Sequence, residues 1–174
     1  GFASMTVSVW CRVEPARRSR RSASSQGVVT KWSFDKKIDS YALWRLGNGK
    51  YEAGNNHKEN HGAGWVEATP GRWQQIVYVH DESLGDKMYS DGILVHEAAS
   101  ITGKIRLSNS PLYIGADNKS GIVWRHFLGS LDDIRIYNRA LSAREVKTLY
   151  GLESRPRSKT TKHRPRLRRK STTP

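Results

Sequence analysis

The sequence is short of cysteine, of acidic residues and of long apolar runs, and each shortage excludes a class of protein. Cys11 is the one cysteine, so neither an intramolecular disulfide framework nor a cysteine-based zinc site can form. No apolar run approaches the roughly 18 residues that span a bilayer, which excludes an integral membrane protein and predicts no membrane insertion. Hydrophobic residues make up 36% of the 174 positions, so we expect part of the chain to stay unfolded.

The excess of basic residues is confined to two short segments. The formal net charge is +14, from 30 Lys and Arg against 16 Asp and Glu. Residues 151–174 account for +8 and the four arginines within 17–21 for +4, which leaves +2 for everything else. The body of the chain is therefore close to neutral, and we predict one domain at residues 1–152.

Residues 153–174 are predicted to form a disordered basic tail. Leu167 is their one aliphatic residue and they contain no aromatic residue, so they bury too little apolar surface to offset the entropy of ordering. One interpretation is a polyanion contact through phosphate or sulfate groups. The other is a solvated end without a specific partner, which the lack of stacking aromatics favours. The contact would be made by Arg164, Arg166, Arg168, Arg169 and Lys170.

The body of the chain reads as short strands separated by turn signals. Apolar and other residues alternate along Val7–Val13, which predicts a half-buried strand. Gly47–Gly49 and Ser90–Gly92 are turn signals that predict two hairpins. Strands at this spacing predict an all-β antiparallel sandwich or barrel.

One helix is predicted after the last strand. Ser142 and Glu145 have the spacing of a capping box, in which each side chain accepts a hydrogen bond from an exposed amide of the other. Leu141 and Val146 occupy the positions of a hydrophobic staple, and Gly151 is expected to close the helix. Because the helix is short, we expect it to dock on the strands.

Five stretches occur in an order that resembles a known family. They are Thr6–Val13, Gly71–Val77, Met88–Gly92, Leu112–Gly115 and Phe127–Ser142. Together they resemble the LamG-like jelly-roll family, part of the concanavalin A-like lectin/glucanase superfamily, over residues 6–150. The resemblance implies an antiparallel jelly-roll β-sandwich with one short C-terminal helix. It implies little about function, because this scaffold carries lectins, glycosidases and adhesion modules.

Two features depart from the family pattern. Family domains usually begin with a further strand, whereas only five residues precede Thr6 here, and no charged-then-apolar leader is present. We therefore expect a processed or fragmentary chain whose first family strand is missing. The loop at residues 17–25 is also unusually basic for the family.

Catalytic signatures are missing from the sequence. Glycoside hydrolysis generally needs two carboxylates about 5–10 Å apart, and related laminarinase-type enzymes carry them as Glu-x-Asp-x-x-Glu, a motif that does not occur here. The nearest acidic cluster is Asp81, Glu82 and Asp86, which we expect in a loop. His57 and His61 have the i, i+4 spacing of helical metal ligands, but their polar surroundings favour a loop. We predict that the chain is not an enzyme.

Structural Ca²⁺ is the one cofactor that the resemblance implies. Relatives often hold it with an Asp of the last strand and backbone carbonyls, and Asp132 aligns with that residue. Carboxylate and carbonyl oxygens suit this hard cation. The alternative is that Asp132 or Asp133 pairs with a nearby basic side chain or accepts hydrogen bonds from loop amides.

Tryptophans supply the remaining functional signal. Trp44 is predicted on the strand face opposite Leu43, where it would line an open sheet, and Trp65 and Trp124 in or beside loops. An aromatic platform beside amides and carboxylates is what sugar recognition requires, although exposed tryptophans also cover the edge of a core. The predicted ligand-binding residues are Trp44, Trp65, Trp124, Asn55, Asn56 and Asp117.

These observations favour a non-catalytic recognition or adhesion module of an extracellular or cell-envelope protein. The expected partner is a glycan or an extracellular protein, with carbohydrate binding preferred. The alternative is a structural or protein-interaction domain whose basic tail contacts polyanions. A diverged glycosidase would need a carboxylate pair that the sequence does not offer.

Overall fold

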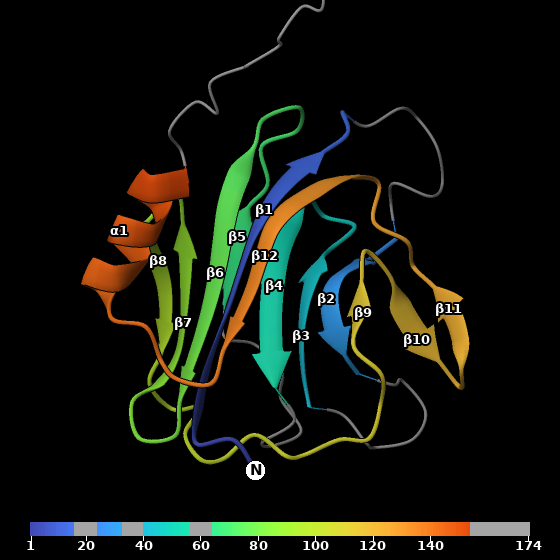
Figure 1. Cartoon of the computed structure of the whole chain (residues 1–174). Coiled ribbons are helices and arrows are strands. Elements are labelled where there is room, and N and C mark those ends of the chain that lie inside the picture. The colour runs from blue at the N-terminus through green and yellow to red at the C-terminus, as the bar shows by residue number, and fades with distance from the viewer. Residues whose placement is uncertain (16–23, 33–39, 56–63, 154–174) are drawn as a thin grey trace, which may run out of the picture.

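The computed structural model describes residues 1–15, 24–32, 40–55 and 64–153, which form two facing five-stranded sheets (Figure 1). The first sheet has the order β12-β1-β6-β7-β8 and the second the order β5-β4-β3-β2-β9. Neighbouring strands are antiparallel throughout. The antiparallel jelly-roll β-sandwich expected from the sequence is confirmed.

The strand bounds are as follows. The first sheet contains β1 (Ser4–Val13), β6 (Gln74–Asp81), β7 (Gly85–Ser90), β8 (Ile93–Ala98) and β12 (Gly129–Tyr137). The second contains β2 (Gln26–Lys31), β3 (Tyr41–Arg45), β4 (Lys50–Asn55), β5 (Trp65–Glu67) and β9 (Tyr113–Ile114). A separate hairpin is formed by β10 (Asp117–Lys119) and β11 (Ile122–Trp124), and the helix α1 covers Ala143–Glu153.

The main core fills the space between the two sheets. Alternation along β1 points Val7, Val9 and Cys11 inward, where each is at most 1% exposed. Opposite them, Leu43 and Tyr51 face inward from the second sheet. Both predicted hairpin turns are present, since β3 joins β4 and β7 joins β8 at the predicted positions. At the second turn Asp91 and Gly92 take positive φ angles of 50° and 77°, which suit a two-residue hairpin.

The helix α1 covers the outer face of the first sheet. The Ser142 amide donates to Glu145 Oε2 at 2.9 Å, and the Glu145 amide donates to Ser142 Oγ at 3.3 Å, so the predicted capping box is confirmed. Leu141 and Val146 are buried against Val77, Val79 and Tyr89 of the sheet. The predicted helix end was wrong: α1 continues through Gly151 to Glu153.

Figure 1 places the β10–β11 hairpin at the end of the sandwich opposite α1. Ser120 and Gly121 form its turn with φ angles of 52° and 87°. This hairpin was not predicted from the sequence, because each of its strands has only three residues and neither shows a clear period. Within the described residues no helix has the length and apolar character needed to cross a membrane.

Candidate functional site: the outer face of β3, β4 and β5

Three side chains lie in register across the outer face of the second sheet. Trp44 of β3 pairs with Glu52 of β4, and Glu52 pairs in turn with Trp65 of β5. Leu43 belongs to the main core and Trp44 to a separate cluster, so the prediction that the two residues face opposite sides is confirmed. Register therefore places a carboxylate between two indoles. Glu52 was not predicted as a site residue, although the 47–49 turn fixes the register that places it opposite Trp44.

Trp65 is the exposed member of this row. Its side chain is 46% exposed, and the Lys50 ammonium lies 3.3 Å from the ring centroid. Lys50 also forms an ion pair with Glu67, at 3.5 Å between Nζ and Oε1. Trp65 is the first residue of the edge strand β5, which agrees with the expected position in or beside a loop. The combination of an indole face, an ammonium and carboxylates can stack on a sugar ring and bond its hydroxyls.

Trp44 does not line an open sheet as predicted, because its side chain is only 7% exposed. Its ring meets the edge of Trp32 at a centroid distance of 5.3 Å. Its indole Nε1 donates to Asp117 Oδ2 at 3.0 Å, and Asp117 is fully buried. The structure thus joins two predicted sugar ligands to each other. Both are withdrawn from direct contact with a ligand and instead fix β3 against the β10–β11 hairpin.

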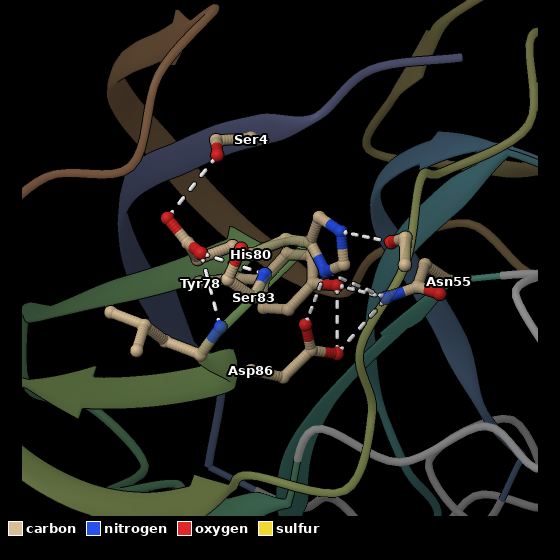
Figure 2. Close-up of polar contacts among 9 residues, drawn as sticks. Ser4, Asn55, Tyr78, His80, Ser83 and Asp86 are labelled. Atoms are coloured by element: carbon tan, nitrogen blue, oxygen red, sulfur yellow. Dashed lines mark hydrogen bonds and ion pairs between the residues drawn. The ribbon is translucent and has the colours of Figure 1, made fainter.

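Asn55 was predicted to bind a sugar, but it lies in the interior of the sandwich at 2% exposure. Its Nδ2 donates to Tyr78 Oη at 2.8 Å and to Asp86 Oδ2 at 3.0 Å (Figure 2). His80 completes this buried cluster, with Nδ1 2.6 Å from Asp86 Oδ1 and Nε2 2.8 Å from the carbonyl oxygen of Gly103. Asn55 is therefore a structural residue that links β4 to β6 and β7.

The buried cluster has a defined hydrogen-bond pattern. The two ring nitrogens of His80 face oxygens on opposite sides, Nδ1 the Asp86 carboxylate and Nε2 the carbonyl of Gly103. Tyr78 donates to Asp86 Oδ2 at 3.0 Å, and burial raises the pKa of its hydroxyl well above the ordinary value. The expected loop position of Asp86 was wrong, since it lies in β7 with no solvent exposure. Substrate cannot reach it there.

Trp124 is half-buried at the end of β11, directly opposite Asp117 in register, and therefore lies beside a loop as expected. Arg125 lies over its ring, with Cζ 4.2 Å from the centroid, and the Lys119 ammonium lies 5.6 Å away. These cations were not identified from the sequence. The signal available there was the Ser120–Gly121 turn, whose register places Lys119 and Trp124 on the same face of the hairpin.

Asp132 lies on β12 and is exposed. Its Oδ1 accepts a hydrogen bond from the Asp133 amide at 2.8 Å, where Asp133 takes a positive φ of 44° and a bulge interrupts the pairing with β1. Within the described ranges no three His, Cys, Asp or Glu residues gather in a way that could hold a metal. Ca²⁺ prefers roughly six to eight oxygen ligands. The described side chains near Asp132 do not supply that number. Calcium binding at Asp132 stays a prediction.

Several predicted residues lie outside the described ranges. They are Asn56, His57 and His61, the basic loop around 17–23, and the tail with Arg164, Arg166, Arg168, Arg169 and Lys170. Their predicted roles stay predictions, as does the domain boundary at residue 152.

A family model matches residues 1–147, which is most of the chain. It describes the concanavalin A-like lectin/glucanases superfamily. A comparison with curated proteins finds no match.

Solved structures share the fold at low sequence identity. The NanB sialidase of Streptococcus pneumoniae has a TM-score of 0.65 at 20% identity over 84% of this chain and 24% of its own. A putative carbohydrate-binding protein from Bacteroides ovatus has a TM-score of 0.61 at 18% identity, over 84% and 40%. Domain 4 of AbnA, an extracellular arabinanase of Geobacillus stearothermophilus solved with arabinotriose, has a TM-score of 0.56 at 17% identity, over 85% and 66%.

The chain spans less than half the length of the first two of these proteins. It therefore corresponds to one domain of a larger protein in those cases. Botulinum neurotoxin receptor-binding domains share the fold as well, with a TM-score of 0.64 for the C/D mosaic at 14% identity, over 87% of this chain and 37% of its own. The similar folds thus include a putative carbohydrate-binding protein and receptor-binding domains.

Proposed function

Because the chain belongs to the concanavalin A-like lectin/glucanase superfamily, we propose that it is a non-catalytic carbohydrate-recognition module. The observation that carries the proposal is the row on the outer face of β3, β4 and β5, where Glu52 lies between Trp44 and Trp65. Trp65 supplies the stacking surface, while Glu52 and Lys50 supply hydrogen-bonding groups beside it. Trp44 holds the row in place through Asp117.

Within the part of the chain that the structure describes, the surroundings of Asp86 and Asp81 support binding over hydrolysis. The Asp86 carboxylate is enclosed by Tyr78, His80 and Asn55. The Asp81 carboxylate accepts hydrogen bonds from the backbone amides of Ser83 and Leu84 in the following turn. In neither case does a second carboxylate stand across an open cleft, as glycoside hydrolysis requires.

We place the module in an extracellular or cell-envelope protein. Similar folds occur in proteins that face the outside of a cell, such as the extracellular arabinanase and the neurotoxin receptor-binding domains. A structural Ca²⁺ at Asp132 belongs to the same proposal, and it is tested by adding Ca²⁺ or a chelator to each binding measurement.

The experiment is a screen of neutral glycans with the full chain at about 150 mM salt, where weak charge contacts are screened. We expect selective binding of at least one neutral glycan. Trp65→Ala should weaken that binding about tenfold, because it removes the stacking face. Trp73→Ala is the matched control: Trp73 also lies under a cation, with Arg12 5.2 Å from its ring, but outside the β3–β4–β5 row.

Loss of binding in both variants would argue against the assigned face. If the folded wild-type chain binds no neutral glycan with or without Ca²⁺, the carbohydrate proposal fails. A structural or protein-interaction domain, with a tail that contacts polyanions, then becomes the better description.

A further inference from the structure

A surface groove of about 680 Å³ lies beside the β10–β11 hairpin. Its volume falls within the range of small-molecule sites, roughly 300–1,000 Å³. Among the described residues that line it, none is acidic and two have basic side chains, so the groove favours a ligand of negative charge. The lining residues are Ser24, Val123, Trp124, Arg125, His126 and Leu128.

The groove combines an indole with cations. The Arg125 Cζ lies 4.2 Å from the Trp124 ring centroid, and the Lys119 ammonium lies 5.6 Å from it. A guanidinium above a ring uses its flat face for that contact, whereas its N–H donors lie in its own plane and suit the two oxygens of a carboxylate or sulfate. His126, with an exposed side chain, adds a second nitrogen group at the rim.

The backbone holds this arrangement in one conformation. Arg125 has a φ of 47°, in the left-handed region that non-glycine residues rarely adopt, and such strain clusters at functional sites. Gly27 packs so closely below that a methyl group there would overlap the Ala116 backbone. Three hydrogen bonds fix the segment: Gly27 N to Arg125 O at 2.8 Å, Phe127 N to Gly115 O at 2.8 Å, and Leu128 N to Gln26 Oε1 at 3.0 Å.

We propose that this groove binds an acidic sugar, with its ring against Trp124 and its carboxylate or sulfate group held by Arg125 and His126. A preorganised site gains affinity because little order is lost on binding. The proposal concerns a second site with its own ligand class and goes beyond the neutral-glycan face of β3, β4 and β5, on which it does not depend.

The test follows the Trp124 indole N–H signal in ¹H–¹⁵N NMR spectra of the full chain at about 150 mM salt. Trp124→Phe assigns that signal by removing it. The probes are tetragalacturonate, which carries only carboxylates, a κ-carrageenan tetrasaccharide, which carries only sulfates, and neutral cellotetraose. We expect a saturable shift with at least one acidic probe and none with cellotetraose, and the two acidic probes tell which anion is preferred. The indole reports the groove even where a probe also touches the tail.

Arg125→Asn removes the guanidinium, and asparagine tolerates the left-handed backbone. It should weaken binding of the acidic probe at least about tenfold, because a charge-assisted contact is lost. Arg144→Gln is the matched control, since Arg144 is exposed on α1 at the opposite end of the sandwich, and affinity should stay within about twofold. Should Arg125→Asn fail to fold, His126→Gln replaces it and should also weaken binding.

The proposal is overturned if neither acidic probe shifts Trp124, if cellotetraose shifts it equally, or if Arg144→Gln weakens binding as much as Arg125→Asn. Unchanged affinity in a folded His126→Gln variant, where it is the replacement, overturns it as well. None of these outcomes touches the β3–β4–β5 face, whose separate readout is neutral-glycan binding by Trp65→Ala.

Discussion

The buried carboxylate of Asp86 should contribute more to the stability of the sandwich than an exposed ion pair does. Its two oxygens meet His80, Tyr78 and Asn55, so it connects β4 of one sheet to β6 and β7 of the other. All these side chains are at most 2% exposed, and water cannot replace a lost partner there. The hydrogen bonds of Asp86 thus form a buried polar link between the two sheets.

Asp86→Asn should lower the free energy of unfolding by about 3 kcal/mol, because it replaces the charged acceptor that three buried side chains share. Chemical denaturation monitored by tryptophan fluorescence measures this loss. Glu97→Gln is the control: Glu97 pairs with Lys87 at 3.0 Å but is half exposed, so its removal should cost under about 1 kcal/mol. Equal losses in the two variants would contradict the role assigned to burial.

At the scale of elements, the start of α1 is built to respond to acid. Glu145 Oε1 pairs with Arg139 at 2.8 Å, and Oε2 accepts from the Ser142 amide. The Arg139 contact first, and the Ser142 hydrogen bonds next, lower the pKa of Glu145 from 4.5 to about 2. Because the pKa of Glu145 is lower in the folded state than in the unfolded state, its ionised form stabilises the fold at any pH above the unfolded-state pKa. This stabilisation is lost as the pH falls from the unfolded-state pKa through the folded-state pKa.

At pH 7 the melting temperature of the wild-type chain should therefore exceed that of the Glu145→Gln variant. The difference between the two melting temperatures should shrink as the pH falls from about 4.5 towards 2. Thermal unfolding at a series of pH values measures it. In an Arg139→Gln background the difference should be smaller at pH 7 and should finish shrinking at a higher pH, because the largest cause of the lowered Glu145 pKa is gone. A difference independent of pH would contradict the ionised cap.

The same element shows what a sequence can predict. The capping box and the two hairpin turns are local patterns, whose partners lie within a few residues, and all three were predicted correctly. The burial of Trp44 was not, because the group that covers its indole, Asp117, lies 73 residues away in the chain. Asn55 was misplaced for the same reason: alternation places a residue on a strand face, but only the fold brings Asp86 to it.

At the scale of the whole molecule, Cys11 reports whether the two sheets are together. It lies at 0% exposure in β1, paired with Gln74 on one side and Leu131 on the other. Burial raises the pKa of its thiol far above the ordinary value, although a hydrogen bond with Tyr51 opposes this in part. Thiolate formation in the native state is thereby suppressed.

Cys11 should therefore react with a thiol reagent only when the whole sandwich opens. Labelling in native buffer should be slow and should accelerate with denaturant in parallel with unfolding measured by fluorescence. Cysteine introduced by Lys147→Cys, on the exposed side of α1, should react at once in the same protein. Fast labelling of Cys11 under native conditions would mean that β1 opens locally.

The position of β1 has a consequence for the order of folding. It is the first strand along the chain, yet Thr6 pairs with Val79 of β6 on one side and with Tyr137 of β12 on the other. Contacts so distant in sequence close slowly, since chain entropy is lost before they form. During synthesis β1 emerges before β12, and one of its backbone edges stays unpaired until β12 has been made. Such an edge can pair with other chains, so association of the growing chain is favoured until β12 covers it.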